Sequence, residues 1–345
     1  MNGTSPGSGG TICSYIDQGN ESRTEHSTPT LGIHMHITLL AVFPILAAFL
    51  GASRMVLAMC SAGILLFIVA VWAAKTDIAR ARGLNKFTAL TNLCFAVPLA
   101  VFGALHLSAA AAVLPAVPAY MPWRLFWAYF VGVALLAASL SIATKIQVLW
   151  SGLLFGIMLF LFALMSDLPG AVANPRNRIE WILVLREMSF AAGGWLLAAG
   201  AMRGLHRSKL IAVGRVVLAI TAIFYGVEHF LHPLHCPGVP LEKIMPAWIP
   251  GRVVIGYLTG AILLLAGTSM LLARKTRLAA TYLGAWVVLL VVFVYGPILI
   301  AQMFDPSTAT KVEGINYFAD TLLFAGAILA LASASPYASG PPKAG

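Results

Sequence analysis

The chain has 345 residues, of which 60% are hydrophobic and only 10% are charged. Soluble domains are about 45–50% apolar and roughly 25% charged, so this composition excludes most soluble folds, and it also excludes intrinsic disorder. The formal net charge is +10, but the basic residues lie in short clusters between apolar runs and form no basic-aromatic stripe. We therefore expect a lipid bilayer, and no nucleic acid, as the partner of this chain.

The chain begins with a polar segment, 1–32, that lacks the charged start and apolar core of a signal peptide. Ten apolar segments follow, and they predict an all-α, polytopic membrane protein, because helices satisfy their own backbone hydrogen bonds in lipid. Their approximate ranges are 34–52, 55–74, 86–113, 125–143, 147–166, 182–201, 210–231, 252–273, 278–301 and 316–334. The first is the weakest, since it is short and contains Pro44, and a short tail, 336–345, ends the chain.

The charges of the loops predict the orientation. One set of loops carries the basic residues Lys75, Arg80, Arg82, Lys86, Lys145, Arg203, Arg207, Lys209, Arg274, Lys275 and Arg277. The opposite loops are longer and rich in Pro, Asp and Glu. Because basic loops stay in the cytoplasm, we expect both termini inside, in a bacterial inner membrane. If only one of the first two segments failed to span, all later segments would invert, against this signal.

An internal repeat organises most of the chain. The segment NKFTALTNLCFAVPLAVFGALHL from Asn85 aligns without a gap with SKLIAVGRVVLAITAIFYGVEHF from Ser208, and MPWRLFWAYFVG from Met121 resembles IPGRVVIGYLTG from Ile249. At one constant offset, the residues Glu180, Glu187 and Gly193 match Glu313, Asp320 and Gly326. Each copy holds four helices, so the copies share an orientation and form a parallel repeat. The predicted parts are two N-terminal helices with a basic loop in 33–84, a first module in 85–206 and a second in 207–335.

Polar residues inside the spans are costly and are therefore candidates for a functional site. Each copy has a His near the outer end of its first helix, an Arg at the start of its second, a Tyr five residues later, and an acid about one turn into its fourth. These residues are His106, Arg124, Tyr129 and Glu187 in the first copy, and His229, Arg252, Tyr257 and Asp320 in the second, where Glu228 adds a further acid.

An Arg at the membrane boundary can fork onto a carboxylate, and a nearby His can relay a proton. We expect His229, Arg252 and Asp320 to lie within hydrogen-bonding range of one another. Arg252 would hold the polar head of a quinone, a lipid or another amphiphile, and Tyr257 would add a donor. Two alternatives remain open: the Arg–acid pairs only lock the helices together, or these side chains only anchor the spans at the interface.

A metal site is a separate hypothesis. Imidazole and thiolate ligands suit Zn or Cu, and four such residues fall within eight positions: His229, His232, His235 and Cys236. Pro233 and Pro237 break the helix there, so we interpret the segment as a loop with incidental histidines and predict no metal site. A haem, which needs one axial His, stays open. His34 and His36 flank the first segment, as interfacial histidines often do.

Each repeat resembles a DoxX-type four-helix membrane module. The resemblance rests on the Gly-x-x-His end of the first helix (GALH and GVEH), the Pro-x-Arg start of the second and the acid early in the fourth, and it covers about residues 85–335. The matching positions are His106, Arg124 and Glu187, and His229, Arg252 and Asp320. The tandem duplication and the two leading helices depart from the single-module form.

The family takes its name from a subunit of a membrane thiosulfate:quinone oxidoreductase, so the resemblance implies a redox-associated membrane protein with a partner subunit. The chain itself has no hydride-transfer fingerprint, iron–sulfur spacing or nucleotide loop. Electrons would have to come from a partner or a bound cofactor, and whether the protein is an enzyme is open. A transporter of a small molecule or lipid, and a non-catalytic scaffold, are the alternatives.

Overall fold

The computed structural model describes residues 52–335, which belong to one compact unit of the chain, Ala48–Gly345. Within the described residues the secondary structure is entirely helical, apart from an isolated bridge between His235 and Ile244. The predicted all-α class is confirmed for this part. The two predicted tails, His34, His36 and nearly all of the first apolar segment lie outside the described residues.

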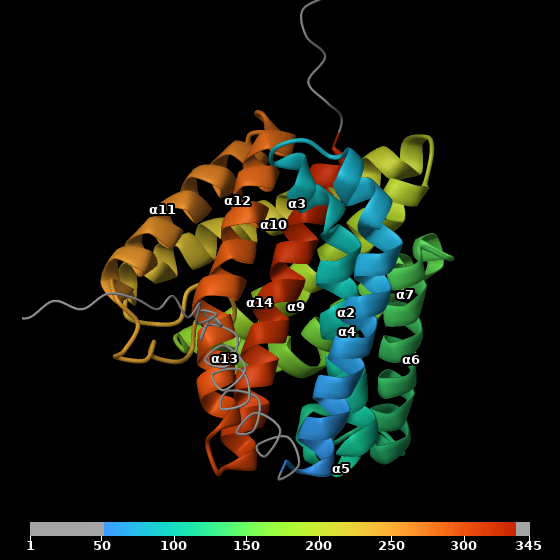
Figure 1. Cartoon of the computed structure of the whole chain (residues 1–345), viewed down its shortest axis with the longest axis vertical. Coiled ribbons are helices and arrows are strands. Elements are labelled where there is room, and N and C mark those ends of the chain that lie inside the picture. Colours follow the sequence, from blue (N-terminus) through green and yellow to red (C-terminus); the bar gives the residue numbers. More distant parts are fainter. Residues whose placement is uncertain (1–51, 336–345) are drawn as a thin grey trace, which may run out of the picture. The chain divides into compact units, whose positions relative to one another are not determined.

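Nine helices between residues 52 and 335 are long and apolar enough to cross a bilayer (Figure 1). They match the second to the tenth predicted segments one by one, so this is a multi-pass helical membrane protein. The continuous ones are α2 (Arg54–Arg80), α4 (Thr91–Ser108), α6 (Arg124–Thr144), α9 (Arg178–Ala201), α10 (Leu205–Leu231), α11 (Arg252–Leu271) and α14 (Thr308–Ala334). Two are compound: α7 (Val148–Phe162), η2 (Ala163–Asp167) and α8 (Leu168–Ala173); and α12 (Thr276–Leu290), η3 (Val291–Tyr295) and α13 (Gly296–Met303). The short helices are α3 (Asn85–Ala89), α5 (Ala110–Val113) and η1 (Leu114–Ala116).

Both compound helices contain a π-helical turn, η2 and η3, that ends two residues before a proline. Pro169 and Pro297 occupy the second position of α8 and α13. Proline has no N–H to donate, and its ring clashes with the carbonyl four residues earlier, which in both cases lies inside the π turn. The wider turn relieves this clash without ending the helix. A π-helical turn followed by a proline therefore occurs at corresponding places in the third helices of the two predicted copies.

Helices α9 and α14 begin earlier than their apolar patterns suggest. The side chain of Asn177 accepts a hydrogen bond from the backbone N–H of Ile179, and that of Ser307 accepts one from Thr310, so each helix starts with a capped, polar first turn. Glu187 and Asp320 consequently lie nine and twelve residues after the first helical residue, which is about 13 and 18 Å along the axis. The prediction that both acids lie one turn into their helices is wrong.

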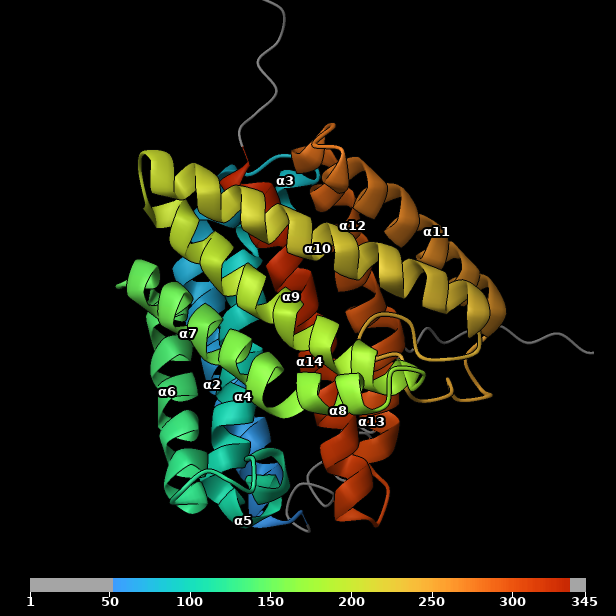
Figure 2. The ribbon, with the colours of Figure 1, turned by 180° about the vertical axis from the view of Figure 1, so that it is seen from behind.

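The last helix, α14, is the most enclosed, with 83% of its apolar window buried, and it contacts α4, α9 and α12. Figure 2 shows α9 crossing in front of α14, with α10 lying across both. Helix α4 packs on α14, while α10 packs on α9. The first helix of each predicted copy therefore contacts the fourth helix of the other copy, and the two fourth helices meet at the centre of this unit.

Candidate functional site

Arg186, on α9, lies between two carboxylates. Its Nη2 donates to Glu187 Oε1 at 2.9 Å, and its Nη1 donates to Asp320 Oδ2, on α14, at 3.3 Å. The three side chains are mostly enclosed, with exposed fractions of 21% for Arg186, 12% for Glu187 and 11% for Asp320. We call these three residues the Arg186 centre. One guanidinium thus joins the two acids that the sequence repeat marks as equivalent.

Two atoms of the Arg186 centre have no hydrogen-bond partner. They are the Nε of Arg186, which is a donor, and the Oε2 of Glu187, which is an acceptor, and both are buried. An unsatisfied buried polar group costs about 1–3 kcal/mol, and more when it is charged. The centre therefore offers one free donor and one free acceptor, on adjacent residues, to a small polar group.

The last residues of the two π-helical turns interact electrostatically with this centre. Asp167, the last residue of η2, interacts electrostatically with Glu187 and Arg186, and Tyr295, the last residue of η3, interacts with Asp320. Such turns are frequent at functional sites, because they redirect side chains within an otherwise regular helix. With Asp167 included, three carboxylates interact with the one guanidinium of Arg186.

The prediction that Arg252 and Arg124 pair with carboxylates is wrong. Arg252 Nη1 donates to the carbonyl of Met245 at 2.9 Å, and Arg124 Nε donates to that of Val117 at 3.1 Å while its Nη2 bonds Leu114. Each arginine is the first residue of its helix, and helical side chains tilt towards the N-terminus. Both guanidinium groups therefore reach back to the preceding loop, away from acids that lie deeper in the bundle.

His229 is fully buried and both of its ring nitrogens are engaged. Nδ1 bonds the carbonyl of Tyr225 at 2.6 Å, and Nε2 accepts the backbone N–H of Gly238 at 3.1 Å. The expected cluster of His229, Arg252 and Asp320 is therefore wrong, because these bonds direct the imidazole to a loop rather than to the acid. His106, its counterpart in the first copy, bonds the carbonyl of Phe102 on its own helix at 2.8 Å.

The two tyrosines lie at the surface, with exposed fractions of 45% for Tyr129 and 43% for Tyr257. The ring of Tyr257 packs on Phe230, with centroids 5.6 Å apart. Exposed Tyr rings near the ends of membrane spans are typical interfacial anchors. The structure does not bring either tyrosine to the Arg186 centre.

Glu228 is buried and belongs to a second ionic cluster. Arg178 Nη1 lies 3.3 Å from Glu228 Oε2, and His232 Nε2 lies 3.7 Å from the same oxygen. Arg178 also donates to His235 Nε2 and to the carbonyl of Leu241, both at 3.3 Å. Burial, and then the charges of Arg178 and His232, lower the pKa of His235, so this ring is a neutral acceptor at pH 7.

The residues of the metal hypothesis do not converge on one point. Between residues 52 and 335 no group of three or more His, Cys, Asp or Glu side chains is placed to hold a metal ion. His229 already uses both ring nitrogens, for the carbonyl of Tyr225 and the N–H of Gly238.

Arg186, Arg178 and Asp167 were not among the residues predicted from the sequence. The comparison of the two copies favours residues that occur in both, whereas Arg186 corresponds to Ala319 and has no basic equivalent. The available signal was the charge itself, since a dipeptide of Arg186 and Glu187 interrupts an apolar run. A single charge without a counterpart can form ion pairs with acids on two helices when it lies where those helices meet.

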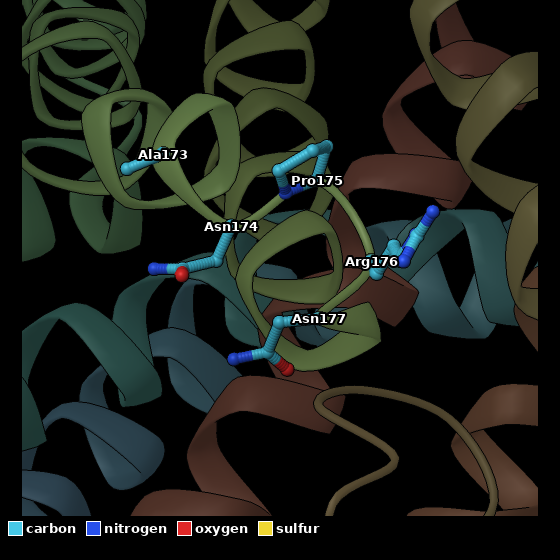
Figure 3. Close-up of a pocket in the computed structure, with 5 residues that line it drawn as sticks. All are labelled: Ala173, Asn174, Pro175, Arg176 and Asn177. Atoms are coloured by element: carbon cyan, nitrogen blue, oxygen red, sulfur yellow. The ribbon is translucent and has the colours of Figure 1, made fainter.

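An open hollow of about 640 Å³ lies at the turn between α8 and α9 (Figure 3). It is lined by Ala173, Asn174, Pro175, Arg176 and Asn177. Figure 3 shows the amides of Asn174 and Asn177 on one side of the turn and the guanidinium of Arg176 on the other. The hollow contains none of the predicted site residues and no part of the Arg186 centre.

Comparisons with family models, curated proteins and solved structures give no match for this chain. The Arg186 centre combines a shared guanidinium, two unpartnered buried atoms and a position where α9 meets α14.

Proposed function

We propose that this DoxX-like membrane protein binds the polar head of a quinone, or of a similar amphiphile, at the Arg186 centre. The observation that carries the proposal is the adjacent unpartnered pair, Arg186 Nε and Glu187 Oε2. A quinone carbonyl accepts a hydrogen bond from the arginine, and a quinol hydroxyl donates one to the carboxylate. The surrounding apolar helices suit the ring and the tail, and a redox partner subunit would exchange electrons with the bound molecule.

We further propose that the two four-helix modules are related by an axis between α9 and α14. Arg186 then serves the equivalent acids of both modules. Two observations support this arrangement. A π-helical turn occurs in the third helix of each module, and the first helix of each module packs on the fourth helix of the other, α4 on α14 and α10 on α9.

We place the basic loops in the cytoplasm of a bacterium and both termini inside. The connections around α3, between α9 and α10, and between α11 and α12 lie at one end of this unit (Figure 1). Glu187 and Asp320 both lie 14 residues before the last residue of their helices, about 21 Å from that end. In a hydrocarbon core about 30 Å thick, the Arg186 centre would lie inside the membrane, nearer the outer face.

The orientation predicts which loops react with an impermeant thiol reagent. On a background without native cysteines, a single cysteine at the exposed position Asn174 should react in intact spheroplasts. One at the exposed position Ser208 should react only after permeabilisation. Reaction at Ser208 in intact spheroplasts, with none at Asn174, would show that the chain lies the other way round.

Quinone binding is tested with a matched pair of arginine variants. We expect the purified protein to retain quinone that mass spectrometry detects in an organic extract, and to bind decylubiquinone, as followed by tryptophan fluorescence. Arg186→Lys keeps the charge but removes the Nε donor, which should weaken binding about 10-fold or more, the worth of one charge-assisted hydrogen bond. Arg252→Lys, whose guanidinium bonds a loop carbonyl, should leave the affinity unchanged. A wild-type protein that neither retains nor binds quinone would contradict the proposal.

Transport is the second candidate, and the position of the centre favours it. Parallel-repeat transporters hold their ligand between the two copies, which is where α9 and α14 place Arg186. Proteoliposomes separate the two functions. A transporter would move a preloaded ligand across the bilayer and lose this activity in Arg186→Lys, whereas a binding protein would retain the ligand without flux.

A further inference from the structure

The connection between α10 and α11, residues 232–251, enters the bundle. Its residues 236–241 are all buried, while Glu242, Lys243 and Ile244 are exposed. Figures 1 and 2 both show this connection at the level of the middle of α14. Irregular backbone at membrane depth is tolerated only where protein surrounds it, so we call residues 236–241 the re-entrant segment.

Side chains from four different helices hold the re-entrant segment by its backbone. Thr321 Oγ1, on α14, donates to the carbonyl of Val239 at 2.9 Å, and Tyr295 Oη, at the end of η3, donates to that of Pro237 at 2.8 Å. The N–H of Gly238 donates to His229 Nε2, on α10, at 3.1 Å. These three bonds are all buried, and a fourth, from Arg178 Nη1 on α9 to the carbonyl of Leu241 at 3.3 Å, is partly buried. Each of the four depends on one replaceable side chain.

The re-entrant segment is held on α14 next to a residue of the Arg186 centre. Thr321 directly follows Asp320 in α14, and Tyr295 interacts electrostatically with that carboxylate. The corresponding connection of the first copy, residues 109–123, has only Ala110 buried and makes no such insertion. Of these two connections, only the one in the second predicted copy is therefore buried in the bundle.

We infer that the re-entrant segment is the gate of the Arg186 centre, and that His229 is the latch that holds it closed. This inference rests on the proposed function, because it concerns access of the ligand to that centre. The helices around the centre cannot separate without exposing α14, the most enclosed helix. The re-entrant segment can move away when its four side-chain bonds break, and no helix has to unfold.

Cys236 reports on the gate, because it lies in the re-entrant segment and is buried. In the full chain in detergent, with Cys13→Ser, Cys60→Ala and Cys94→Ala, we would measure the rate at which dithiodipyridine reacts with this thiol. His229→Leu removes the acceptor of the Gly238 N–H and should raise the rate about 10-fold or more, the worth of one buried hydrogen bond. His106→Leu, in the matching histidine of the first copy, should leave the rate unchanged.

A second variant keeps the shape of the core. The double change Tyr295→Phe and Thr321→Val removes two bonds to the re-entrant segment and should raise the Cys236 rate as His229→Leu does, even where His229→Leu folds poorly. Thr259→Val is its control, because that hydroxyl accepts a bond from Trp286, away from the gate. In the wild type, bound decylubiquinone should slow the reaction, since the ligand lies behind the closed segment.

The gate and the binding site fail in different ways. A folded double variant whose Cys236 reacts no faster than in the Thr259→Val control overturns the gate, whatever the protein binds. Faster reaction of Cys236 in a protein that binds no quinone supports an opening segment and contradicts the proposed ligand.

Discussion

Replacing Arg186 by Leu should lower the free energy of unfolding by about 3–5 kcal/mol, the usual cost of removing one partner from a buried ion pair. The change leaves Glu187 and Asp320 enclosed without the guanidinium that both of them contact. Unfolding in mixed micelles of dodecyl maltoside and SDS, followed by tryptophan fluorescence, measures this loss.

Two further variants identify the cause of that loss. Arg252→Leu removes one bond to the carbonyl of Met245 and should cost only about 1 kcal/mol. Combining Arg186→Leu with Glu187→Gln and Asp320→Asn removes both uncompensated charges and should recover most of the stability. If Arg186→Leu destabilises the protein no more than Arg252→Leu does, Arg186 is not the electrostatic centre of the bundle.

Replacing Gly193 by Leu should lower the free energy of unfolding by about 3 kcal/mol, at the upper end of what overpacking costs. A Cβ at this position would lie 2.6 Å from the Cβ of Ala327 and 2.8 Å from its Cα, so α9 and α14 would have to move apart. Because the Arg186 centre spans the same two helices, we also expect weaker quinone binding from this variant.

Gly200 provides the matched control on the same helix. A Cβ there meets no atom within 4 Å, so Gly200→Leu should be neutral or should stabilise the protein by up to about 1 kcal/mol through helix propensity. Equal losses of stability in the two variants would show that helix propensity, and not the contact of α9 with α14, decides the effect.

The spans were predictable because each depends on its own residues. A run of about 20 apolar residues suffices to identify a membrane helix, and the nine described spans follow the predicted segments closely. The boundaries of α9 and α14 differ by several residues, because Asn177 and Ser307 cap polar turns that hydropathy does not register. That local error also displaced the expected depth of Glu187 and Asp320.

The candidate site was predictable only in part. Comparison of the two copies selected Glu187 and Asp320, and both belong to the Arg186 centre. It also selected Arg252 and His229, which hold loops, since the first residue of a helix points back to its loop and the buried imidazole binds Gly238. The residue that connects the two acids, Arg186, has no equivalent in the repeat and was for that reason passed over.

The apolar segments alone identify a multi-pass helical membrane protein, and the predicted repeat aligns Glu187 with Asp320. Lipid provides no hydrogen bonds, so each span has to satisfy its backbone locally, and a local pattern reveals it. The partners of each charge follow from the packing of the helices, because the crossing of α9 and α14 brings together residues more than 130 positions apart in the chain. Two charges in a membrane pair only when their groups are close in space and lie at the same depth. Neither condition can be read from the spacing of residues along one helix.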